Sequence, residues 1–477
     1  MFRNDRLLRK TKVIATIGPA CDHPETLSAM IAAGMNVARL NLSHGSFQSH
    51  RTRLDQVRKT AASMAANVAV MADTRGREIR TGIVADGAME LERGQDFVLY
   101  SDGRTGTGEG VSVSHKALYV HVQRGHRVLL DDGAIELLVT GISNQTVQCR
   151  VECGGTLRTN KSVNLPDTPQ VADDLESDDE GDLRFAAEHD VDYIAASFIR
   201  SGDDIRRLQT QLRALGANIP IIAKIESREG VQNLEEIIVN ADGAMVARGD
   251  LGVELPLAMG PLIQKRVIRT TVTNGKPVIT ATQMLDSMER NPRPTRAEAS
   301  DVANAILDGT SAVMLSGETA VGAYPVQAVS TMVALALEAE TGLRDFGSLQ
   351  QILPNPSNQV TEAVAQAAIT MANHLHAATI IALTETGFTA RLISKYRPGC
   401  PILAVTTSER VYRRLAMNWG VYGFRYPEEG TDQDKIAYAT RHAKRVGLLR
   451  TGDLVIATAG SSHTAGSTDL IRVLSVD

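Results

Sequence analysis

Eight short apolar runs, each ending in a polar cluster, constrain the fold of this 477-residue chain more than any other feature of its sequence. The runs are KVIATIG from Lys12, NVARLNLSHG from Asn36, NVAVMADTRG from Asn67, DYIAASFIR from Asp192, PIIAKIES from Pro220, GAMVARGD from Gly243, PVITATQM from Pro277 and SAVMLSGE from Ser311. Helical patterns such as PETLSAMIAAG and NLEEIIVNA lie between most of them, which indicates repeated βα units of about thirty residues. Eight such units predict a TIM (β/α)8 barrel, whose functional residues lie at the carboxyl ends of the strands.

The polar residues that end these runs predict a single functional rim. Every run except the first clearly contributes to it, through Arg39, Asn41, Ser43, Asp73, Ser197, Lys224, Glu226, Arg248, Asp250, Thr282, Ser316 and Glu318. A doubly wound sheet is the alternative interpretation of alternating strands and helices, but it would gather its polar ends near one switch point. The spread of the polar ends along the chain favours the barrel.

Two segments depart from the βα repeat and predict further domains. About ninety residues after Asp73 contain the strand patterns DFVLY, RVLLDDG, IELLVTG and TVQCRVE, which predicts a small all-β domain inserted above the rim as a lid. Beyond LPNPSNQV from Leu353, the stretches TIIALTETGFTARLISKYRP, PILAVTT and DLVIATAGSS predict an α/β domain. We expect a catalytic barrel in residues 1–74 and 166–344, a β cap in residues 75–165 and a C-terminal α/β domain in residues 345–477.

The composition excludes several classes of partner. A formal charge of −5 over the whole chain argues against nucleic acid and anionic membranes, so any anionic ligand has to be bound by locally placed cations. The N-terminus lacks the apolar stretch of a secretory signal and no apolar run is long enough to span a membrane, so we expect a cytoplasmic protein. The four cysteines are interpreted as free thiols, and the acidic stretch 172–182 as a solvated helix start instead of a metal site.

Charged residues at the rim indicate the class of chemistry. Lys224 and Glu226 lie two apart and therefore project from the same face of a strand. Glu226 and Asp250, expected on neighbouring strands, are hard oxygen donors that suit Mg²⁺ or Mn²⁺ supplemented by substrate oxygens and water; salt bridges within the rim are the alternative interpretation. Arg39, Arg80 and Lys224 are expected at this rim without an excess of acids to neutralise them, which favours metal-dependent phosphoryl transfer.

Eight motifs follow one another along the chain: ATIGPA, RLNLSHG, DTRGREIRTG, AKIES, MVARGDLGVE, ITATQMLDSM, NPRPTRAEASDVANAILDGT and MLSGETAVGAYP. In this order they resemble the pyruvate kinase family. The resemblance runs from about Thr11 to the C-terminus and is most specific from Val278 to Pro325. It implies a TIM barrel with an inserted β cap and a C-terminal regulatory domain. It also implies transfer of a phosphoryl group from phosphoenolpyruvate to ADP, which gives pyruvate and ATP.

The resemblance implies a role for each rim residue. Glu226 and Asp250 would hold the divalent metal, and Lys224 would lie against the phosphoryl group, where its charge stabilises the transition state. The residues implied for phosphate binding are Arg39 and Arg80, those for the nucleotide and substrate are His44, Lys161, Gly249, Asp250 and Thr282, and those for K⁺ are Asn41, Ser43, Asp73 and Thr74. Glu78 matches the potassium-dependent branch of the family.

The resemblance assigns protonation of the pyruvate enolate to the region of Thr282, with a polar relay near Ser316 and Glu318. Because a threonine hydroxyl is a poor acid, we expect water to be the immediate donor and Thr282 to orient it. Hydrogen bonding within the rim is the alternative interpretation of Thr282 and Ser316.

Loops of the C-terminal domain resemble the sugar-phosphate activator site of the family. Their residues are Thr384, Thr386, Gly387, Thr389, Ser461 and Gly466. Such turns bind phosphate through backbone N–H groups, and they are equally common as ordinary turns. Phe388 stands where family members that are activated by sugar phosphates often have a basic residue, so the identity of the effector stays open. The sequence also departs from the usual family pattern at Arg75, Arg77 and Asp167. These departures leave open how the cap closes and how tightly the nucleotide binds. Family members are usually homotetramers, and we expect one here.

Two other functions stay open on the residues alone. Barrels that stabilise enolates with a metal also serve as C–C lyases or mutases of pyruvate-like acids, and a weakened sugar-phosphate sensor would keep only the C-terminal site. A lysine between metal and phosphate favours transfer over a lyase. A sensor would have no need of Lys224, Glu226 and Asp250 together.

Overall fold

The computed structural model describes residues 9–76, 78–168, 179–349, 352, 359–460 and 468–477. Its central body is a closed barrel of parallel strands in the order β1, β16, β15, β14, β13, β12, β3, β2. The strands are β1 (Lys12–Thr16), β2 (Val37–Asn41), β3 (Ala69–Asp73), β12 (Tyr193–Ala196), β13 (Ile221–Ile225), β14 (Gly243–Ala247), β15 (Val278–Ala281) and β16 (Ala312–Leu315). Each strand lies within one of the eight apolar runs, so the predicted TIM barrel is confirmed.

The barrel strands are apolar along their length because both of their faces are buried. Ile14, Met71, Ile222, Met245 and Ile279 belong to the cluster that fills the interior. Alternate residues of the same strands face outward and pack against a ring of helices. The principal helices of the ring are α1 (Pro24–Ala33), α2 (Phe47–Ser63), α4 (Asp179–Glu188), α5 (Gly202–Ala214), α7 (Leu234–Asn240), α9 (Gly260–Thr273), α10 (Arg296–Leu307) and α12 (Pro325–Thr341).

The segment between β3 and α4 forms a separate β-rich cap. A six-stranded sheet runs in the order β11, β7, β8, β9, β5, β6, and a two-stranded sheet pairs β10 with β4. The strands are β4 (Ala88–Leu91), β5 (Asp96–Tyr100), β6 (Gly110–Ser112), β7 (Arg127–Leu130), β8 (Ile135–Ser143), β9 (Thr146–Cys153), β10 (Gly155–Arg158) and β11 (Val163–Asn164). One short helix, α3 (Leu118–His121), interrupts the predicted all-β composition. Phe97, Leu130 and Leu137 belong to a core that the cap does not share with the barrel.

The C-terminal part is an α/β body around a five-stranded sheet in the order β19, β18, β17, β20, β21. Its strands are β17 (Thr379–Leu383), β18 (Ile402–Thr406), β19 (Val421–Arg425), β20 (Leu454–Gly460) and β21 (Thr468–Ser475), and only β21 pairs antiparallel with its neighbour. The helices beside it are α14 (Gln359–His374), α15 (Phe388–Lys395), α16 (Glu409–Arg414) and α17 (Asp432–Arg445). The predicted C-terminal α/β fold is confirmed.

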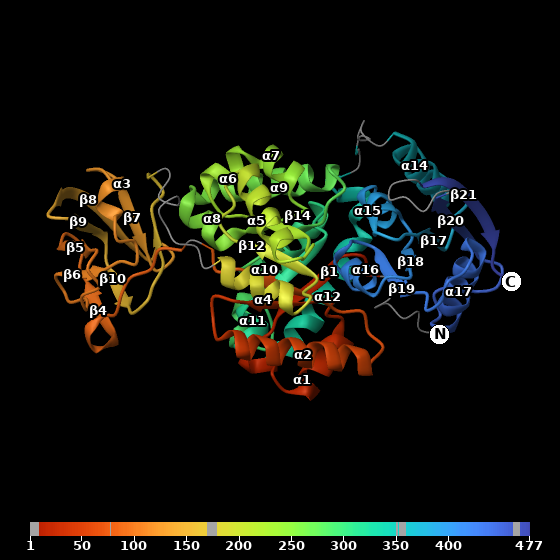
Figure 1. Cartoon of the computed structure of the whole chain (residues 1–477), viewed down its shortest axis with the longest axis horizontal. Coiled ribbons are helices and arrows are strands. Elements are labelled where there is room, and N and C mark those ends of the chain that lie inside the picture. The colour runs from red at the N-terminus through yellow and green to blue at the C-terminus, as the bar shows by residue number, and fades with distance from the viewer. Residues whose placement is uncertain (1–8, 77, 169–178, 350–351, 353–358, 461–467) are drawn as a thin grey trace.

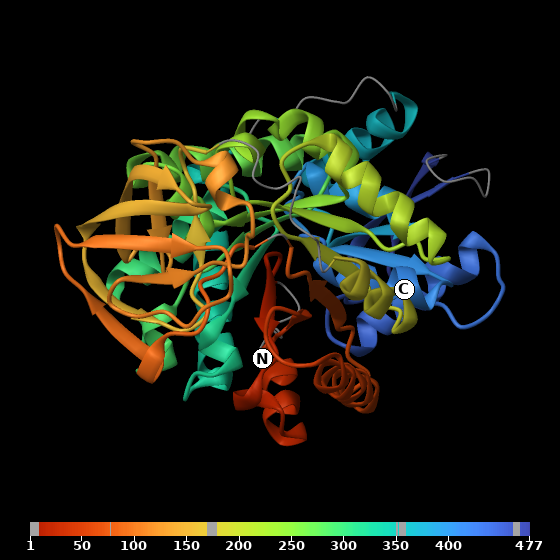
Figure 2. The same ribbon diagram turned by 60° about the vertical axis from the view of Figure 1, so that its left-hand side comes forward.

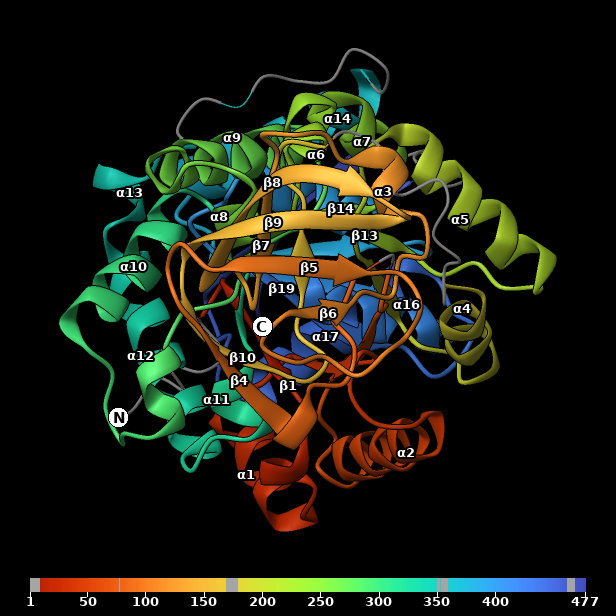
Figure 3. The ribbon, with the colours of Figure 1, turned by 90° about the vertical axis from the view of Figure 1, so that its left-hand side faces the viewer.

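Cap, barrel and C-terminal body lie in a row, with the barrel in the middle (Figure 1). The cap leaves the barrel after β3 and covers one end (Figures 2 and 3). The C-terminal body contacts the opposite end, where the strands begin: Lys12 Nζ donates to Val421 O over 2.6 Å, and Ala416 and Met417 join the cluster inside the barrel. The carboxyl ends of the strands therefore face the cap.

Two predictions from composition can be compared with the structure. All four cysteines are free, as predicted. Among the described residues, no helix combines the length and the apolar character that a membrane span requires.

Candidate active site

Lys224, near the end of β13, lies at the centre of a charged network at the carboxyl rim. Its Nζ is 2.8 Å from Glu226 Oε1 and 3.1 Å from Asp73 Oδ1, and it donates to Ser197 Oγ over 2.7 Å. Lys224 and Glu226 face the same way, as their spacing predicted. Burial lowers the pKa of Lys224, but the carboxylates of Asp73, Glu226 and Asp250 outweigh it and the pKa is raised. The side chain therefore stays an ammonium ion at neutral pH.

Arg39 occupies the same network from β2. Its Nε is 2.6 Å from Asp73 Oδ2, and its Nη1 donates to Thr16 Oγ1 over 3.0 Å. Burial would raise the pKa of Asp73, but Arg39 and Lys224 hold it below its usual range. Thr16 ends β1, so the first strand also contributes to the rim, through a contact that the sequence pattern did not reveal.

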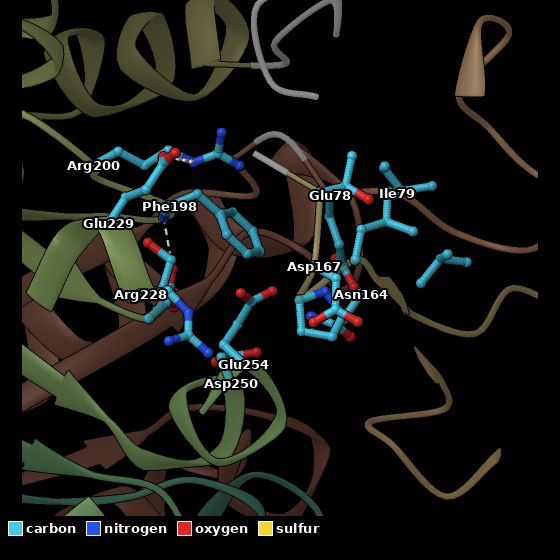
Figure 4. Close-up of a pocket in the computed structure, with 16 residues that line it drawn as sticks. Glu78, Ile79, Asn164, Asp167, Phe198, Arg200, Arg228, Glu229, Asp250 and Glu254 are labelled. Carbon is cyan, nitrogen blue, oxygen red and sulfur yellow. Dashed lines mark hydrogen bonds and ion pairs between the residues drawn. The ribbon is translucent and has the colours of Figure 1, made fainter. Parts of the chain in front are cut away.

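Glu226 and Asp250 line one cavity of about 420 Å³ between the barrel and the cap (Figure 4). Figure 4 shows the cap side of the cavity with Glu78 and Asp167 across from the barrel residues. Burial raises the pKa of Glu226, and the neighbouring Asp250 adds to this although Lys224 opposes it. The pKa of Asp250 is raised by burial and by the carboxylates of Asp132 and Glu78. Repulsion among neighbouring carboxylates is relieved by a bound cation.

The two carboxylates suit a hard divalent cation that takes further ligands from elsewhere. Glu226 and Asp250 offer carboxylate oxygens, which Mg²⁺ and Mn²⁺ prefer. Within the described ranges, no three His, Cys, Asp or Glu side chains are grouped as a complete metal site. A cation held by this pair would therefore take its remaining ligands from substrate oxygens, the backbone or water.

The expectation that the rim cations lack balancing acids is wrong. Arg39 pairs with Asp73, Lys224 with Asp73 and Glu226, and Arg80 Nη2 lies 2.8 Å from Glu78 Oε2. The two pairs that include Asp73 join side chains from different strands, so they depend on the closure of the barrel and are not visible in the order of the sequence. The pairs of Lys224 with Glu226 and of Arg80 with Glu78 join residues two apart on one segment. The salt bridges that the sequence left as an alternative are thus present, and two of their acids, Glu78 and Glu226, also line the cavity.

The residues expected at the nucleotide site fall into two groups. Arg80 and Lys161 lie on adjacent cap segments, where Thr81 N donates to Lys161 O and Lys161 Nζ lies 2.8 Å from Asp131 Oδ1. His44 is exposed on the barrel side, and partial burial together with Arg80 and Arg39 lowers its pKa. Of the described residues, the 420 Å³ cavity is lined by neither Arg80, Lys161 nor His44. The structure brings them to the same junction of barrel and cap without placing them in one pocket.

The residues expected at the K⁺ site meet at the ends of β2 and β3. The strands are in register so that Asn41 lies beside Asp73, and Ser43 N donates to Asn41 Oδ1 over 3.3 Å. Thr74 follows Asp73, and its Oγ1 accepts from Ser197 N over 3.2 Å. Asp73 is already shared between Arg39 and Lys224, which the sequence did not indicate. Hard oxygen donors are gathered here as a monovalent cation requires.

Thr282 has a backbone conformation that β-branched residues seldom adopt. Its φ is +65° and that of Gln283 is +52°, both in the left-handed region. Arg248 holds this turn, since its Nη2 donates to Thr282 O over 2.6 Å and to Gln283 O over 3.0 Å while its Nη1 pairs with Asp301 at 2.6 Å. Thr282 Oγ1 accepts from Gly249 N over 2.9 Å and lies 2.7 Å from Ala281 O, which joins two of the predicted site residues.

Glu318 is buried and bound to the backbone. Its Oε1 accepts from Leu285 N over 3.0 Å and its Oε2 from Ser316 N over 2.7 Å. Burial raises its pKa. Ser316 Oγ is buried, and no described residue gives it a hydrogen-bond partner. Glu318 therefore fixes the loop that carries Ser316, and the unpartnered hydroxyl is the group left to contact a substrate or water.

The described part of the predicted effector loop is a compact turn. Gly387 (φ +80°) donates its N–H to Thr384 Oγ1 over 2.9 Å, and Thr389 Oγ1 lies 2.6 Å from Thr468 Oγ1. Thr386 Oγ1 accepts from Phe388 N over 3.4 Å. The predicted residues Ser461 and Gly466 lie outside the described residues. The Glu385 carboxylate lies 3.1 Å from Lys435 and accepts from Thr407, which adds a negative group that the sequence analysis passed over.

Two of the three departures from the family pattern have clear partners. Arg75 Nη2 lies 2.8 Å from Asp182 Oδ1, and Asp182 is buried in the first turn of α4. The interpretation of the acidic stretch as a solvated helix start is therefore wrong for Asp182. Residues 172–178 of that stretch and Arg77 lie outside the described residues. Asp167 binds Arg127 through two contacts of 2.9 Å, which ties the segment returning from the cap to β7.

Comparison with known proteins agrees with this architecture over almost the whole chain. The family model for "Pyruvate kinase, barrel domain" matches residues 8–329, and that for "Pyruvate kinase, alpha/beta domain" matches residues 362–474. Pyruvate kinase of Geobacillus stearothermophilus is 46% identical over 469 residues, which cover 98% of this chain and 80% of that protein. Pyruvate kinase of Clostridium acetobutylicum is 43% identical over 473 residues, which cover 98% of this chain and all of that protein.

Proposed function

The chain belongs to the pyruvate kinase family, and from this premise we propose that Lys224 stabilises the phosphoryl group as it passes from phosphoenolpyruvate to ADP. The chain is a phosphotransferase of glycolysis whose products are pyruvate and ATP. The observation that supports the role of Lys224 is its place in the rim: a protonated ammonium beside Glu226, which shares a cavity with Asp250. A positive charge at that point favours the transition state, in which negative charge is spread over the transferred oxygens.

The network around Lys224 explains how the charge is kept in place. Three acceptors, on Asp73, Ser197 and Glu226, match the three protons of an ammonium group. Because these groups are held by strand ends, little reorganisation is needed when the substrate arrives. Arg39 would bind the phosphate of phosphoenolpyruvate from the same side, since Asp73 and Thr16 orient its guanidinium.

Glu226 and Asp250 would hold the divalent cation, Mg²⁺ or Mn²⁺. When bound, the cation would neutralise charge on the phosphoryl oxygens and bring the two anionic substrates together. The raised pKa values of both carboxyls support this assignment: burial raises both, Asp250 adds to the pKa of Glu226, and Asp132 and Glu78 add to that of Asp250, so an added positive charge would stabilise both carboxylates.

The cap would act as a lid over the nucleotide. His44 and Gly249 on the barrel and Arg80 and Lys161 on the cap would contact ADP, with Asp250 reaching it through the cation. The cavity between the two parts supports closure around a ligand at this junction. Asn41, Ser43, Asp73 and Thr74 would bind K⁺, and Glu78 would belong to the potassium-dependent class.

Protonation of the enolate would complete the reaction. Thr282 would orient a water molecule, and the unpartnered hydroxyl of Ser316 would contact that water. Glu318 would act by fixing the Ser316 loop. The strained conformation of Thr282 supports a functional assignment, because such conformations cluster at active sites.

The remaining assignments concern the whole protein. We propose a barrel in residues 1–74 and 166–344, a cap in 75–165 and a regulatory domain in 345–477 whose loops at Thr384–Thr389 bind a phosphorylated effector. We also propose a cytoplasmic homotetramer, as is usual in the family.

A coupled assay of pyruvate formation tests the proposal. We expect turnover with phosphoenolpyruvate, ADP, Mg²⁺ and K⁺, and its loss when any one of them is omitted. Pyruvate formed without ADP would indicate a phosphatase or lyase and would contradict phosphoryl transfer to a nucleotide.

A further inference from the structure

The turn after β12, formed by Ser197 and Phe198, contacts both charged residues of the PIIAKIES segment. Ser197 Oγ accepts a hydrogen bond from Lys224 Nζ over 2.7 Å. Phe198 N donates to Glu226 Oε2 over 2.6 Å, a contact drawn as a dashed line in Figure 4. One turn thus holds the proposed phosphoryl-stabilising lysine through a side chain and the proposed metal ligand through the backbone.

We propose that Ser197 is a positioning residue for phosphoryl transfer, whose hydroxyl fixes the Lys224 ammonium while the adjacent backbone N–H fixes Glu226. This inference rests on the proposed role of Lys224. Ser197 itself acts through Lys224 and need not touch the substrate.

The hydroxyl of Ser197 has two acceptors within reach, Thr74 O at 2.7 Å and Asp73 Oδ1 at 3.5 Å, and the shorter contact favours donation to Thr74. Because its single proton goes to one of these acceptors, its lone pairs are left for Lys224. An ammonium group cannot accept, so the direction of the Lys224–Ser197 bond is also fixed. Ser197 therefore connects the end of β3, where K⁺ is proposed to bind, to the lysine on β13.

Ser197 is also the partner of Lys224 that competes least with the proposed metal. Glu226 would share its oxygens with the cation, and Asp73 is divided between Lys224 and Arg39. A neutral hydroxyl draws no metal away from the carboxylates, yet it holds the ammonium at a hydrogen-bond distance. The contacts with Ser197 and Asp73 thus stay available to Lys224 when a cation takes Glu226, and Ser197 is not shared with Arg39 as Asp73 is.

The turn of Ser197 and Phe198 has an unusual backbone conformation and packs closely against Gly76. Phe198 has a φ of +55°, a conformation that bulky residues seldom adopt. Gly76, in the segment that leads from β3 into the cap, packs directly on the turn, because a Cβ there would lie 2.8 Å from both Ser197 Cβ and Phe198 Cδ2. The first connection to the cap therefore rests on the residues that hold Lys224 and Glu226.

The variant Ser197→Ala tests the inference, because it removes the hydroxyl and leaves the Phe198 N–H in place. We expect kcat to fall by about 10- to 100-fold, the usual effect of losing a group that orients a reacting side chain. KM for phosphoenolpyruvate and the dissociation constant of Mn²⁺, measured by titration without substrates, should change far less, because Arg39, Glu226 and Asp250 are untouched. Ser197→Thr, which keeps a hydroxyl, should recover most of kcat.

Ser201→Ala is the matched control. Ser201 lies in the same loop and also loses a hydroxyl hydrogen bond, since its Oγ accepts from Asp204 N at the start of α5, but it has no contact with Lys224. Its kcat should stay close to that of the unmodified chain. A fall in kcat of similar size in Ser201→Ala would overturn the inference, because the effect would then belong to the loop as a whole.

Four further outcomes have a clear meaning. Wild-type turnover in Ser197→Ala together with lost turnover in Lys224→Met would overturn the inference and leave the proposed role of Lys224 standing. Wild-type turnover in both variants would contradict the proposed function as well. Loss of Mn²⁺ binding alongside kcat in Ser197→Ala, or failure of Ser197→Thr to recover kcat, would show that the residue is merely structural and would also overturn the inference.

Discussion

Replacement of Lys224 by methionine tests the central electrostatic argument. Methionine keeps most of the length and apolar character of the side chain but removes the charge that lies 2.8 Å from Glu226 and 3.1 Å from Asp73. Two opposite unit charges about 3 Å apart interact by about 5.5 kcal/mol at an effective dielectric of about 20. If between half and all of an interaction of this size arises only in the transition state, kcat falls by about 10² to 10⁴.

The same substitution should act in the opposite direction on the metal. Without the ammonium, Glu226 loses a neighbour that competes for its oxygens, so Mn²⁺ should bind more tightly in Lys224→Met than in the unmodified chain. The two measurements are the coupled pyruvate assay at saturating substrates and a titration of Mn²⁺ without substrates. Lys224→Arg is the control for charge, because it keeps a positive side chain but changes its shape. Its turnover should lie between that of the unmodified chain and that of Lys224→Met, since a guanidinium does not replace an ammonium in a tight site. Near-normal turnover in Lys224→Met would refute the assigned role.

Three other predictions concern the cations and the stability of the chain. Asp250→Asn should raise the Mg²⁺ concentration needed for half-maximal turnover by about tenfold or more, and an unchanged requirement would exclude Asp250 as a ligand. Turnover should depend on K⁺, since Asn41 and Asp73 lie side by side at the rim, and full activity in buffer free of K⁺ and Na⁺ would contradict that site. Burial lowers the pKa of Lys12 from its ordinary value of 10.5 to about 7. Between pH 7 and 10.5 the unfolded chain therefore binds more protons than the folded chain, so the free energy of unfolding should rise with pH across that window. Lys12→Met should remove this rise in denaturant titrations at several pH values, and an identical pH dependence in both chains would show that Lys12 is not its source.

Sequence patterns predicted the barrel and the identity of its rim residues for a physical reason. Parallel strands buried on both faces must be apolar, and their carboxyl ends must meet at one edge, so each run located a strand and its polar end located the rim. The spacing of Lys224 and Glu226 likewise fixed their common face. These are local properties of the chain, and the structure confirms them.

The partners of the rim residues could not be predicted in the same way. Asp73 on β3 lies between Arg39 on the neighbouring β2 and Lys224 on β13, which is two strands away across β12, and no local pattern encodes that contact. The left-handed turn at Thr282 was also missed, because threonine disfavours positive φ and the turn is held by hydrogen bonds from Arg248 and Gly249, which lie on another strand end. For Asp182 a helix-start pattern gave the correct element but not its burial, which depends on Arg75 from the far side of the cap insertion.

The charge balance of the cavity changes the argument for added cations. Its lining includes six acids (Glu78, Asp167, Glu226, Glu229, Asp250 and Glu254) and two arginines (Arg200 and Arg228). Four of the acids pair with a basic side chain, namely Glu78 with Arg80, Asp167 with Arg127, Glu226 with Lys224 and Glu229 with Arg200. Among the described residues, Asp250 and Glu254 have no such ion pair. The sequence had suggested the reverse, a surplus of basic groups waiting for phosphates. Two anionic substrates entering a cavity of this kind meet carboxylates at short range, and each such pair at about 4 Å costs about 4 kcal/mol at an effective dielectric of about 20. Lys224 and Arg39 cannot offset this alone, because both are already paired with carboxylates. The unpaired carboxylate of Asp250 beside Glu226 therefore supports the proposed divalent cation, and removing Asp250 should weaken metal binding while the attraction of the basic groups for phosphate stays in place.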